Sequence, residues 1–195
     1  MTRRRLPLVR HADPQRDAAA CAEIYAPFVR DSAVTFEEQP PSAAEFAGRI
    51  ERAHVWLVAA EPDGTVVGFA YGCPHRERAA YRWATDVSVY IADRHRGRGL
   101  GRELYGELLD QLRRQGFHVA CAGITLPNEP SVALHESFGF EQIGVYRQIG
   151  WKAGAWRDVG WWQARLIPPG DGPPGEPGRQ GDEPPAEPRT PAAAV

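Results

Sequence analysis

The sequence predicts one mixed α/β domain, a central sheet flanked by helices, followed by a disordered tail. Stretches with the two-residue period of a strand are interspersed with stretches of helical period, without strict alternation of the two. Residues 1–167 hold nearly all the large apolar side chains of the 195-residue chain, enough for a core. Residues 168–195 hold half of the 18 prolines and no aromatic residue, so they cannot offset the entropy of ordering.

The N-terminal half of the domain predicts a strand, two helices and a hairpin. Asp13 followed by Pro14 is typical of a helix start, with a capping carboxylate and a proline in the first turn. Pro62-Asp63-Gly64 predicts the hairpin turn. The expected elements are a strand at Leu6–Arg10, helices beginning at Asp13 and at Ser42, and strands at Val55–Ala60 and Thr65–Tyr71.

The second half predicts four strands and two helices. The longer helix has an apolar face, because leucines recur at helical spacing from Leu100 to Leu112. The expected elements are strands at Trp83–Ile91, His118–Thr125, Glu141–Ile149 and Arg157–Leu166, and helices at Gly99–Gln115 and Asn128–Phe138. The order strand–helix–helix–strand–strand–strand–helix–strand–helix–strand–strand fits neither a strict βαβ fold nor a β-sandwich.

Composition excludes several classes of function. No apolar run is long enough to span a bilayer, and the basic N-terminus does not lead into the apolar stretch of a signal peptide. The tail carries five acidic residues against two arginines, which leaves the domain near neutral, without the charge expected for nucleic-acid binding. Three distant cysteines without a C-x-x-C pair argue against a disulfide scaffold or a structural zinc site, and we expect a cytoplasmic protein without a metal.

A glycine-rich turn is the strongest local signal. The strand ending in Val89-Tyr90-Ile91 leads into Arg96-Gly97-Arg98-Gly99-Leu100-Gly101, which opens the leucine-faced helix. Glycines let backbone N–H groups approach a ligand, and the start of a helix favours an anion. The spacing fits neither G-x-G-x-x-G nor the P-loop. It matches R/Q-x-x-G-x-G/A, and it predicts a pyrophosphate cradle.

With this motif, the chain resembles the GNAT superfamily of acetyl-CoA-dependent N-acetyltransferases, and within it the phosphinothricin and methionine sulfoximine N-acetyltransferases. The resemblance covers nearly the whole domain. It is carried by Thr35-Phe36, Pro40, Tyr71-Gly72-Cys73-Pro74, Ala80-Tyr81-Arg82-Trp83, Ser88-Val89-Tyr90, Leu126-Pro127-Asn128-Glu129-Pro130-Ser131, Leu134-His135-Glu136, Gly139-Phe140 and Trp156-Arg157-Asp158-Val159-Gly160-Trp161-Trp162-Gln163. Each motif alone is weak, but so many in this order are specific.

The resemblance implies a GNAT fold with acetyl-CoA as co-substrate. The backbone of Val89, Tyr90 and Ile91 would pair with the pantetheine arm and polarise the thioester carbonyl. The pyrophosphate would be held by Arg96, Gly97, Arg98, Gly99, Leu100, Gly101 and Arg102. Asn128 and Ser137 would contact the distal part of acetyl-CoA.

Two side chains are the candidates for proton transfer. Asp86 lies on the long strand, in phase with Ser88 and Tyr90. Related enzymes usually carry a Glu there, and the shorter Asp favours action through a water molecule; the alternative is a strand carboxylate paired with an arginine. His135 stands where many GNAT enzymes have a tyrosine that protonates the leaving thiolate. An imidazole can donate or accept a proton near neutral pH.

The expected substrate is the α-amine of a small amino-acid analogue. Arg76 and Arg78 are candidate anion contacts, with surface solvation as the alternative. The resemblance places further substrate contacts at Phe36, Tyr71, Ala79, Ala80 and Tyr81, with Tyr90 also lining the pocket, although strand aromatics are also typical of a core. Arg76 replaces a Lys common in this branch and Ala79 an Asn, which affects the expected specificity.

Two other functions remain open: a broader amino-acid or amine acetyltransferase of the same fold, and a CoA-binding sensor without catalysis. Asp86 and His135 favour an enzyme. Enzymes of this branch are typically homodimers, and we expect the aromatic residues of the late strands, Trp151, Trp156, Trp161 and Trp162, to be exposed and to form an interface.

Overall fold

The computed structural model describes residues 7–168, 170 and 175–178. One seven-stranded sheet has the order β1-β2-β3-β4-β5-β7-β6, and all its neighbours are antiparallel except β4 and β5. The elements are β1 (Leu8–His11), α1 (Pro14–Asp31), α2 (Ala43–Arg52), β2 (Val55–Ala60), β3 (Val66–Pro74), η1 (Ala79–Tyr81), β4 (Ala84–Ile91), η2 (Asp93–His95), α3 (Leu100–Arg114), β5 (Val119–Thr125), α4 (Glu129–Glu136), β6 (Glu141–Lys152) and β7 (Ala155–Arg165). This is the predicted order of strands and helices, and most bounds agree within three residues.

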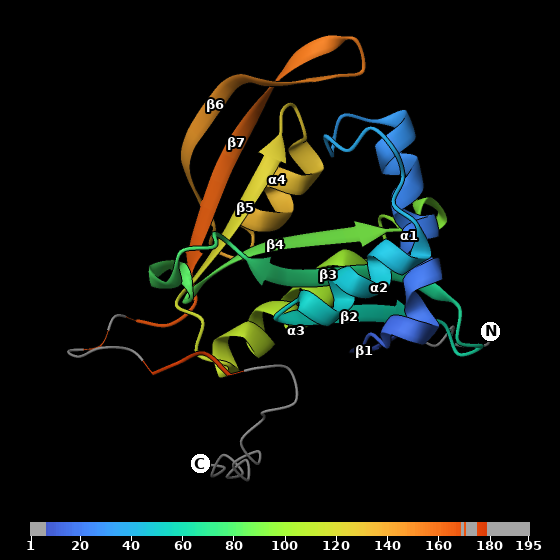
Figure 1. The fold of residues 1–195 in the computed structure, drawn as a ribbon, viewed down its shortest axis with the longest axis horizontal. Helices are drawn as coiled ribbons and strands as arrows, with labels where there is room; N and C mark the ends of the chain where they lie inside the picture. Colours follow the sequence, from blue (N-terminus) through green and yellow to red (C-terminus); the bar gives the residue numbers. More distant parts are fainter. Residues whose placement is uncertain (1–6, 169, 171–174, 179–195) are drawn as a thin grey trace, which may run out of the picture.

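The helices cover opposite faces of the sheet. Leucines of α3, including Leu104 and Leu108, pack against Val55 and Leu57 of β2. On the other face, α1 and α2 pack over Trp56 and the rest of a second apolar cluster. Figure 1 shows α1 and α2 on the near side of the sheet and α3 behind it. All six residues of β2 are buried, because the strand has a helix on each face.

The first two helices begin at the capping residues from which their starts were predicted. Asp13 caps α1 by accepting hydrogen bonds from the backbone N–H groups of Gln15 and Arg16. Ser42 and Glu45 form a capping box at the start of α2. Asp17 is 1% exposed and accepts two hydrogen bonds from Arg10, at 2.6 and 2.8 Å, which attach α1 to β1.

The sheet opens between its two parallel strands. Only three residue pairs join β4 to β5, from Ala84 with Val119 to Asp86 with Cys121. Beyond that rung the strands diverge, as the β4 and β5 arrows do in Figure 1. β4 continues to Ile91, paired only with β3 on its other side among the described residues. This leaves the β5-facing backbone edge of residues 87–91 without a strand partner.

The late strands correct one expectation. Trp151 and Trp156 are exposed as predicted, but Trp162 is 3% exposed and packs in the core under α3, and Trp161 is partly buried. The prediction of a fully exposed aromatic set was wrong for Trp161 and Trp162. The reason for Trp162 is that its side of β7 packs into the apolar cluster that contains the α3 leucines, where its indole N–H donates to Glu136 of α4 at 3.3 Å.

Part of the predicted tail contacts the domain. Glu176 forms an ion pair with Arg82, the Trp83 indole donates a hydrogen bond to the Gly175 carbonyl at 2.7 Å, and the Gly178 N–H donates to the Gln115 carbonyl at 2.7 Å. The other tail residues, apart from 168 and 170, lie outside the described residues, so the disorder predicted for them stays a prediction. In the described part of the chain, none of the helices has the length and apolarity needed to cross a membrane.

Candidate active site

The glycine turn before α3 forms an open cradle of backbone groups. Gly97 and Gly99 have φ angles of +70° and +82°, a region that disfavours other residues. Among the described residues, a Cβ atom at either position would meet nothing within 4 Å, so no other group fills the space next to these two Cα atoms. Gly99 is the N-cap of α3 and supplies no capping side chain. The first N–H groups of α3 receive no hydrogen bond from a capping side chain, so together with the positive end of the helix dipole they can serve an anion.

Two predicted cofactor contacts on different helices are brought together at one end of this cradle. Arg102 on α3 donates a hydrogen bond to the Ser137 hydroxyl at 2.8 Å. Asn128 uses its side-chain oxygen to cap α4, accepting from the Ser131 N–H at 3.3 Å. Arg102, near the start of α3, thus contacts Ser137 at the C-terminal end of α4, while Asn128 lies at the other end of α4.

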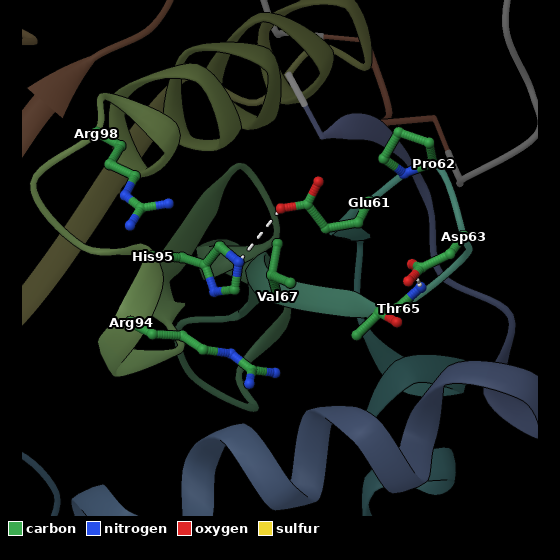
Figure 2. A pocket seen from close by; sticks show the side chains of 8 residues that line it. All are labelled: Glu61, Pro62, Asp63, Thr65, Val67, Arg94, His95 and Arg98. Carbon is green, nitrogen blue, oxygen red and sulfur yellow. Dashed lines mark hydrogen bonds and ion pairs between the residues drawn. The ribbon is translucent and has the colours of Figure 1, made fainter. Parts of the chain in front are cut away.

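A second hollow, of about 590 Å³, lies beside the glycine turn (Figure 2). It is lined by Glu61, Pro62, Asp63, Thr65, Val67, Arg94, His95 and Arg98. Figure 2 shows Arg94 and Arg98 entering from the loop before α3, with the carboxylates of the β2–β3 turn across from them. Nε2 of His95 lies 3.3 Å from a Glu61 carboxylate oxygen. Because two cations and two acids share the hollow, its charge does not select one kind of ligand.

Arg96 lies outside that hollow. Its guanidinium stacks over the Phe28 ring at 4.8 Å and pairs with Asp93 at 3.2 Å. This places Arg96 between the glycine turn and α1. Of the predicted cradle arginines, Arg102 approaches α4, whereas Arg96 and Arg98 are turned toward other elements.

A cluster of side chains lies at the rung where β4 and β5 separate. Nδ1 of His75 lies 2.6 Å from a carboxylate oxygen of Asp86, and the side chains are 16% and 28% exposed. Cys121 is opposite Asp86 on β5. One ligand-type atom from each of these three residues lies within 4.8 Å of the others. Burial raises the pKa of Asp86, and the hydrogen bond with His75 partly opposes this.

Aromatic side chains surround this cluster. The His75 ring meets the edges of Tyr81 and Trp161, with centroid distances of 5.6 and 6.1 Å. Arg76 lies over the Trp161 ring at 5.8 Å and donates to the His75 carbonyl. Tyr81 is 42% exposed and ends η1. The predicted substrate loop therefore does lie next to Asp86.

The remaining residues of that loop are exposed. Ala79 and Ala80 form the 3₁₀ turn, and the Arg78 carbonyl accepts a hydrogen bond from the Tyr81 N–H. Among the described residues, the Arg78 guanidinium has no acidic partner and no ring contact. A cation at the mouth of the site is thus free to meet an anionic group.

The predicted pocket aromatics divide into two groups. Tyr71 stacks on Trp56 at 4.5 Å, and Tyr90 packs edge-on against Tyr25 at 5.0 Å. Both rings therefore pack against the α1–α2 cluster. Phe36 is 38% exposed and lies across the backbone of Gly150, where a Cβ atom would come within 2.2 Å of the ring. The Phe36 loop is therefore held against β6.

His135 is 4% exposed, on α4. Its Nδ1 is 2.7 Å from the Ser131 carbonyl, which can only accept, so Nδ1 carries the hydrogen. Burial lowers the pKa of His135. Nε2 is buried, and within the described chain it has no hydrogen-bond partner; the same is true of the neighbouring Tyr105 hydroxyl. A neutral His135 would therefore present an acceptor, not a donor, at Nε2.

Sequence reasoning missed His75, Cys121 and Trp161 as members of the site. His75 directly precedes Arg76, which was singled out, but no local pattern marks it. Its contact with Asp86 depends on the β3–β4 register, in which Cys73 pairs with Asp86 and His75 is the diagonal neighbour. That register is a tertiary feature.

Known proteins with similar sequences belong to one family of enzymes. The model of the acetyltransferase (GNAT) family matches residues 19–140. A phosphinothricin N-acetyltransferase of Streptomyces viridochromogenes is 42% identical over 150 residues, 75% of this chain and 81% of the relative. An L-methionine sulfoximine/L-methionine sulfone acetyltransferase of Salmonella typhimurium is 34% identical over 81% of this chain and 94% of its own.

A solved structure shares the whole architecture. The GNAT superfamily phosphinothricin acetyltransferase of Sinorhizobium meliloti, in complex with acetyl-CoA, superposes with a TM-score of 0.79 at 34% identity, covering 85% of this chain and 94% of that one. The mixed sheet with its flanking helices is therefore the GNAT fold. The protein belongs to the GNAT family of acetyltransferases and is an N-acetyltransferase.

Proposed function

We propose that this N-acetyltransferase uses acetyl-CoA to acetylate the α-amine of a small amino-acid analogue by direct transfer. Phosphinothricin, methionine sulfoximine and methionine sulfone are the proposed substrates, in line with the names of its relatives. The observation that carries this proposal is the opening between β4 and β5, which has the glycine cradle beyond one end and Asp86 at the other. The amine and the thioester would meet in this opening.

The chain's own residues fit acetyl-CoA on two counts. The open space next to Gly97 and Gly99 supports a pyrophosphate held there by the α3 N–H groups. The unpaired backbone edge of Val89, Tyr90 and Ile91 offers hydrogen-bonding groups to an extended pantetheine arm, as an added strand would use them. Bound there, acetyl-CoA supplies the activated acetyl group. Arg102 would hold the pyrophosphate together with the glycine turn, and Ser137 and Asn128 would contact the distal part of acetyl-CoA.

Asp86 is the proposed centre of proton transfer. An α-amine is an ammonium ion at neutral pH and must lose a proton before it can attack. Asp86 lies at the vertex of the opening, and burial raises its pKa toward the range of a useful base. Its partner is His75, not the arginine that the alternative interpretation of this carboxylate supposed.

The loop from Arg76 to Tyr81 is the proposed substrate-binding segment. Tyr81 supplies an aromatic wall beside His75, and Arg78 has no acidic partner among the described residues. Ala79 and Ala80 leave room beside them, and Phe36 would close the opposite side. Tyr71 and Tyr90 contribute by packing behind the site. The predicted thiolate-protonating role of His135 stays a prediction, since its neutral form presents an acceptor at Nε2.

Acetyl-CoA turnover tests the proposal. Thiol release would be followed with each of the three analogues, the protein amino acids and simple amines as acceptors, and the acetylated product confirmed by mass. We expect turnover with the analogues and acetylation at the α-nitrogen. Comparable rates on ordinary amino acids would favour a broader acetyltransferase. Tight acetyl-CoA binding without turnover of any acceptor would favour a sensor and would overturn the proposal.

A further inference from the structure

We propose that His75 is the catalytic base of this acetyltransferase: its Nε2 takes the proton from the substrate amine, and Asp86 orients the imidazole through Nδ1. The inference rests on the proposed acetyl transfer and specifies which atom receives the proton. In this proposal, His75 takes the place of the water molecule through which the short Asp86 side chain is otherwise expected to accept the proton.

The contact between the two side chains fixes the hydrogens on the ring. His75 Nδ1 and the Asp86 carboxylate oxygen are 2.6 Å apart, the distance of a short charge-assisted hydrogen bond. When Asp86 is ionised, its carboxylate can only accept, so Nδ1 carries the hydrogen and Nε2 holds a lone pair. Within the described chain, no hydrogen bond is made by Nε2 of His75. The basic atom of the pair is therefore available to a substrate.

The position of the ring suits this role. Asp86 is on the last rung that joins β4 to β5, and His75 follows the end of β3 beside it. Tyr81 and Trp161 both pack against the ring in T-shaped geometry, with interplanar angles of 64° and 88°. Two aromatic edges and one carboxylate therefore hold the ring, which lies between the strand opening and the proposed substrate loop.

The distance within the pair is that of a hydrogen bond. Arg76 lies near Asp86 and opposes the upward shift of the Asp86 pKa that burial causes. Two ligands bound to one tetrahedral zinc ion at ~2.0 Å each would be about 3.3 Å apart. At 2.6 Å, His75 and Asp86 instead share a hydrogen.

The proton balance is simple. One N–H bond of the substrate ammonium breaks, and its proton moves to Nε2, giving an imidazolium ion that Asp86 stabilises. The freed nitrogen lone pair forms the bond to the acetyl carbon as the carbon–sulfur bond breaks. The second proton lost by the nitrogen neutralises the departing thiolate, and His75 returns the first proton to solvent.

The kinetics of matched variants test whether His75 takes the proton or only supports the structure of the site. His75→Asn keeps an N–H that can donate to Asp86 but has no basic atom, and exposed His11→Gln is the control. General-base catalysis contributes roughly 10²–10⁴-fold, so kcat/KM of His75→Asn should fall by ~100-fold or more. Acetyl-CoA affinity, measured by calorimetry, should stay unchanged. The activity of His75→Asn should also keep rising with pH until the substrate amine itself is deprotonated, whereas the wild type and His11→Gln should reach their plateau at a lower pH.

A double variant tests whether the two residues act as one unit. Asp86→Asn should also lower kcat/KM, and His75→Asn combined with Asp86→Asn should be no slower than His75→Asn alone. EDTA in all assays should leave these rates unchanged. If the double variant loses kcat/KM by the product of the two single losses, the residues act independently, and the proposal that Asp86 acts through His75 is wrong.

A spectroscopic readout needs no turnover. In protein labelled with ¹⁵N-histidine, long-range ¹H–¹⁵N spectra identify the protonated ring nitrogen, and His75 is assigned by its loss in His75→Asn. We expect hydrogen on Nδ1 at neutral pH. Hydrogen on Nε2 instead would mean that a protonated Asp86 donates to the ring, and it would overturn the proposal.

Different experimental results would contradict the role of His75 and the proposed function. An active wild type with an equally active His75→Asn would overturn the role of His75 alone and return the base to Asp86. A wild type that binds acetyl-CoA but acetylates no acceptor would overturn the proposed function and this role with it.

Discussion

Arg78 is the arginine of the predicted substrate loop that has no acidic partner among the described residues. It lies at the start of the loop that carries Tyr81, whereas its neighbour Arg76 is engaged with Trp161 and the His75 carbonyl. Of the two arginines expected to contact an anion, Arg78 is therefore the better candidate, and Arg76 is the better candidate for shaping the site.

Removing the Arg78 charge should change specificity more than activity. Hydrogen bonds to charged groups contribute about 1.5–3 kcal/mol, so Arg78→Ala should lower kcat/KM for anionic phosphinothricin roughly 10- to 100-fold. Methionine sulfone has no acidic side-chain group and should lose much less. Steady-state kinetics with both substrates measure the ratio. Equal losses would show that Arg78 only shapes the loop.

His135 should make the fold sensitive to acid. Its pKa is lowered from 6.5 by burial, so the unfolded chain binds a proton at a higher pH than the folded one. The contribution to stability is complete above pH 6.5 and declines as the pH falls from there toward the folded pKa. His54 is lowered by burial in the same way and adds to the effect.

Urea denaturation at about pH 7.5 and about pH 5.5 measures this sensitivity. His135→Gln should reduce the loss of unfolding free energy between the two, by up to about 1.4 kcal/mol per pH unit for one group. Exposed His11→Gln should leave the slope as in the wild type. An unchanged slope in His135→Gln would mean that the imidazole is charged in the folded protein.

Among the elements, the turn that opens α3 carries the most function for its length. Gly97 and Gly99 have positive φ angles, and the helix behind them is anchored by fully buried leucines such as Leu104 and Leu108. The glycines therefore lie just before a helix that is held in place by its buried leucines. A substitution in the turn should change ligand binding without unfolding α3.

Gly99→Asp tests this separation. A non-glycine residue in the left-handed region costs about 1–2 kcal/mol, and the added carboxylate would repel a pyrophosphate. Loss of two charge-assisted hydrogen bonds would weaken acetyl-CoA binding by ~100-fold or more. Gly154→Asp, at φ +71° with nothing within 4 Å of its Cβ, has the same backbone cost in the β6–β7 turn and should bind normally. Calorimetry measures the acetyl-CoA affinity of the two folded variants. Equal affinities would contradict the binding of acetyl-CoA at the glycine turn.

For the whole molecule, the β6–β7 hairpin is the conspicuous feature. It extends past the helices at one end of the sheet (Figure 1). Five of its large apolar side chains are more than half exposed: Ile143, Tyr146, Ile149, Trp151 and Trp156. An apolar surface of this kind is costly in water unless another chain covers it, and we expect a homodimer through this hairpin.

Light scattering should give twice the 21.5 kDa chain mass at micromolar concentration. Trp156→Glu places a charge in the expected interface and should shift the mass toward one chain. Leu8→Glu is the control, because Leu8 is 67% exposed on β1 at the opposite edge of the sheet, and it should remain dimeric. A monomeric wild type would contradict the interface.

The sequence by itself determined the order of the elements, the helix starts at Asp13 and Ser42, and the glycine cradle. These features depend on neighbours in the chain: caps, turn residues and the period of apolar side chains. The position of Asp86 on its strand was predictable for the same reason, since alternation along one strand is a local property.

Only the tertiary structure decided the partner of Asp86 and the burial of Trp162. His75 reaches Asp86 because β3 and β4 pair in one register, and a shift of one residue would turn it to the other face. Trp162 is buried because its side of β7 packs into the apolar cluster that contains the α3 leucines. Register and strand order arise from contacts between distant segments, which no local pattern in the chain encodes.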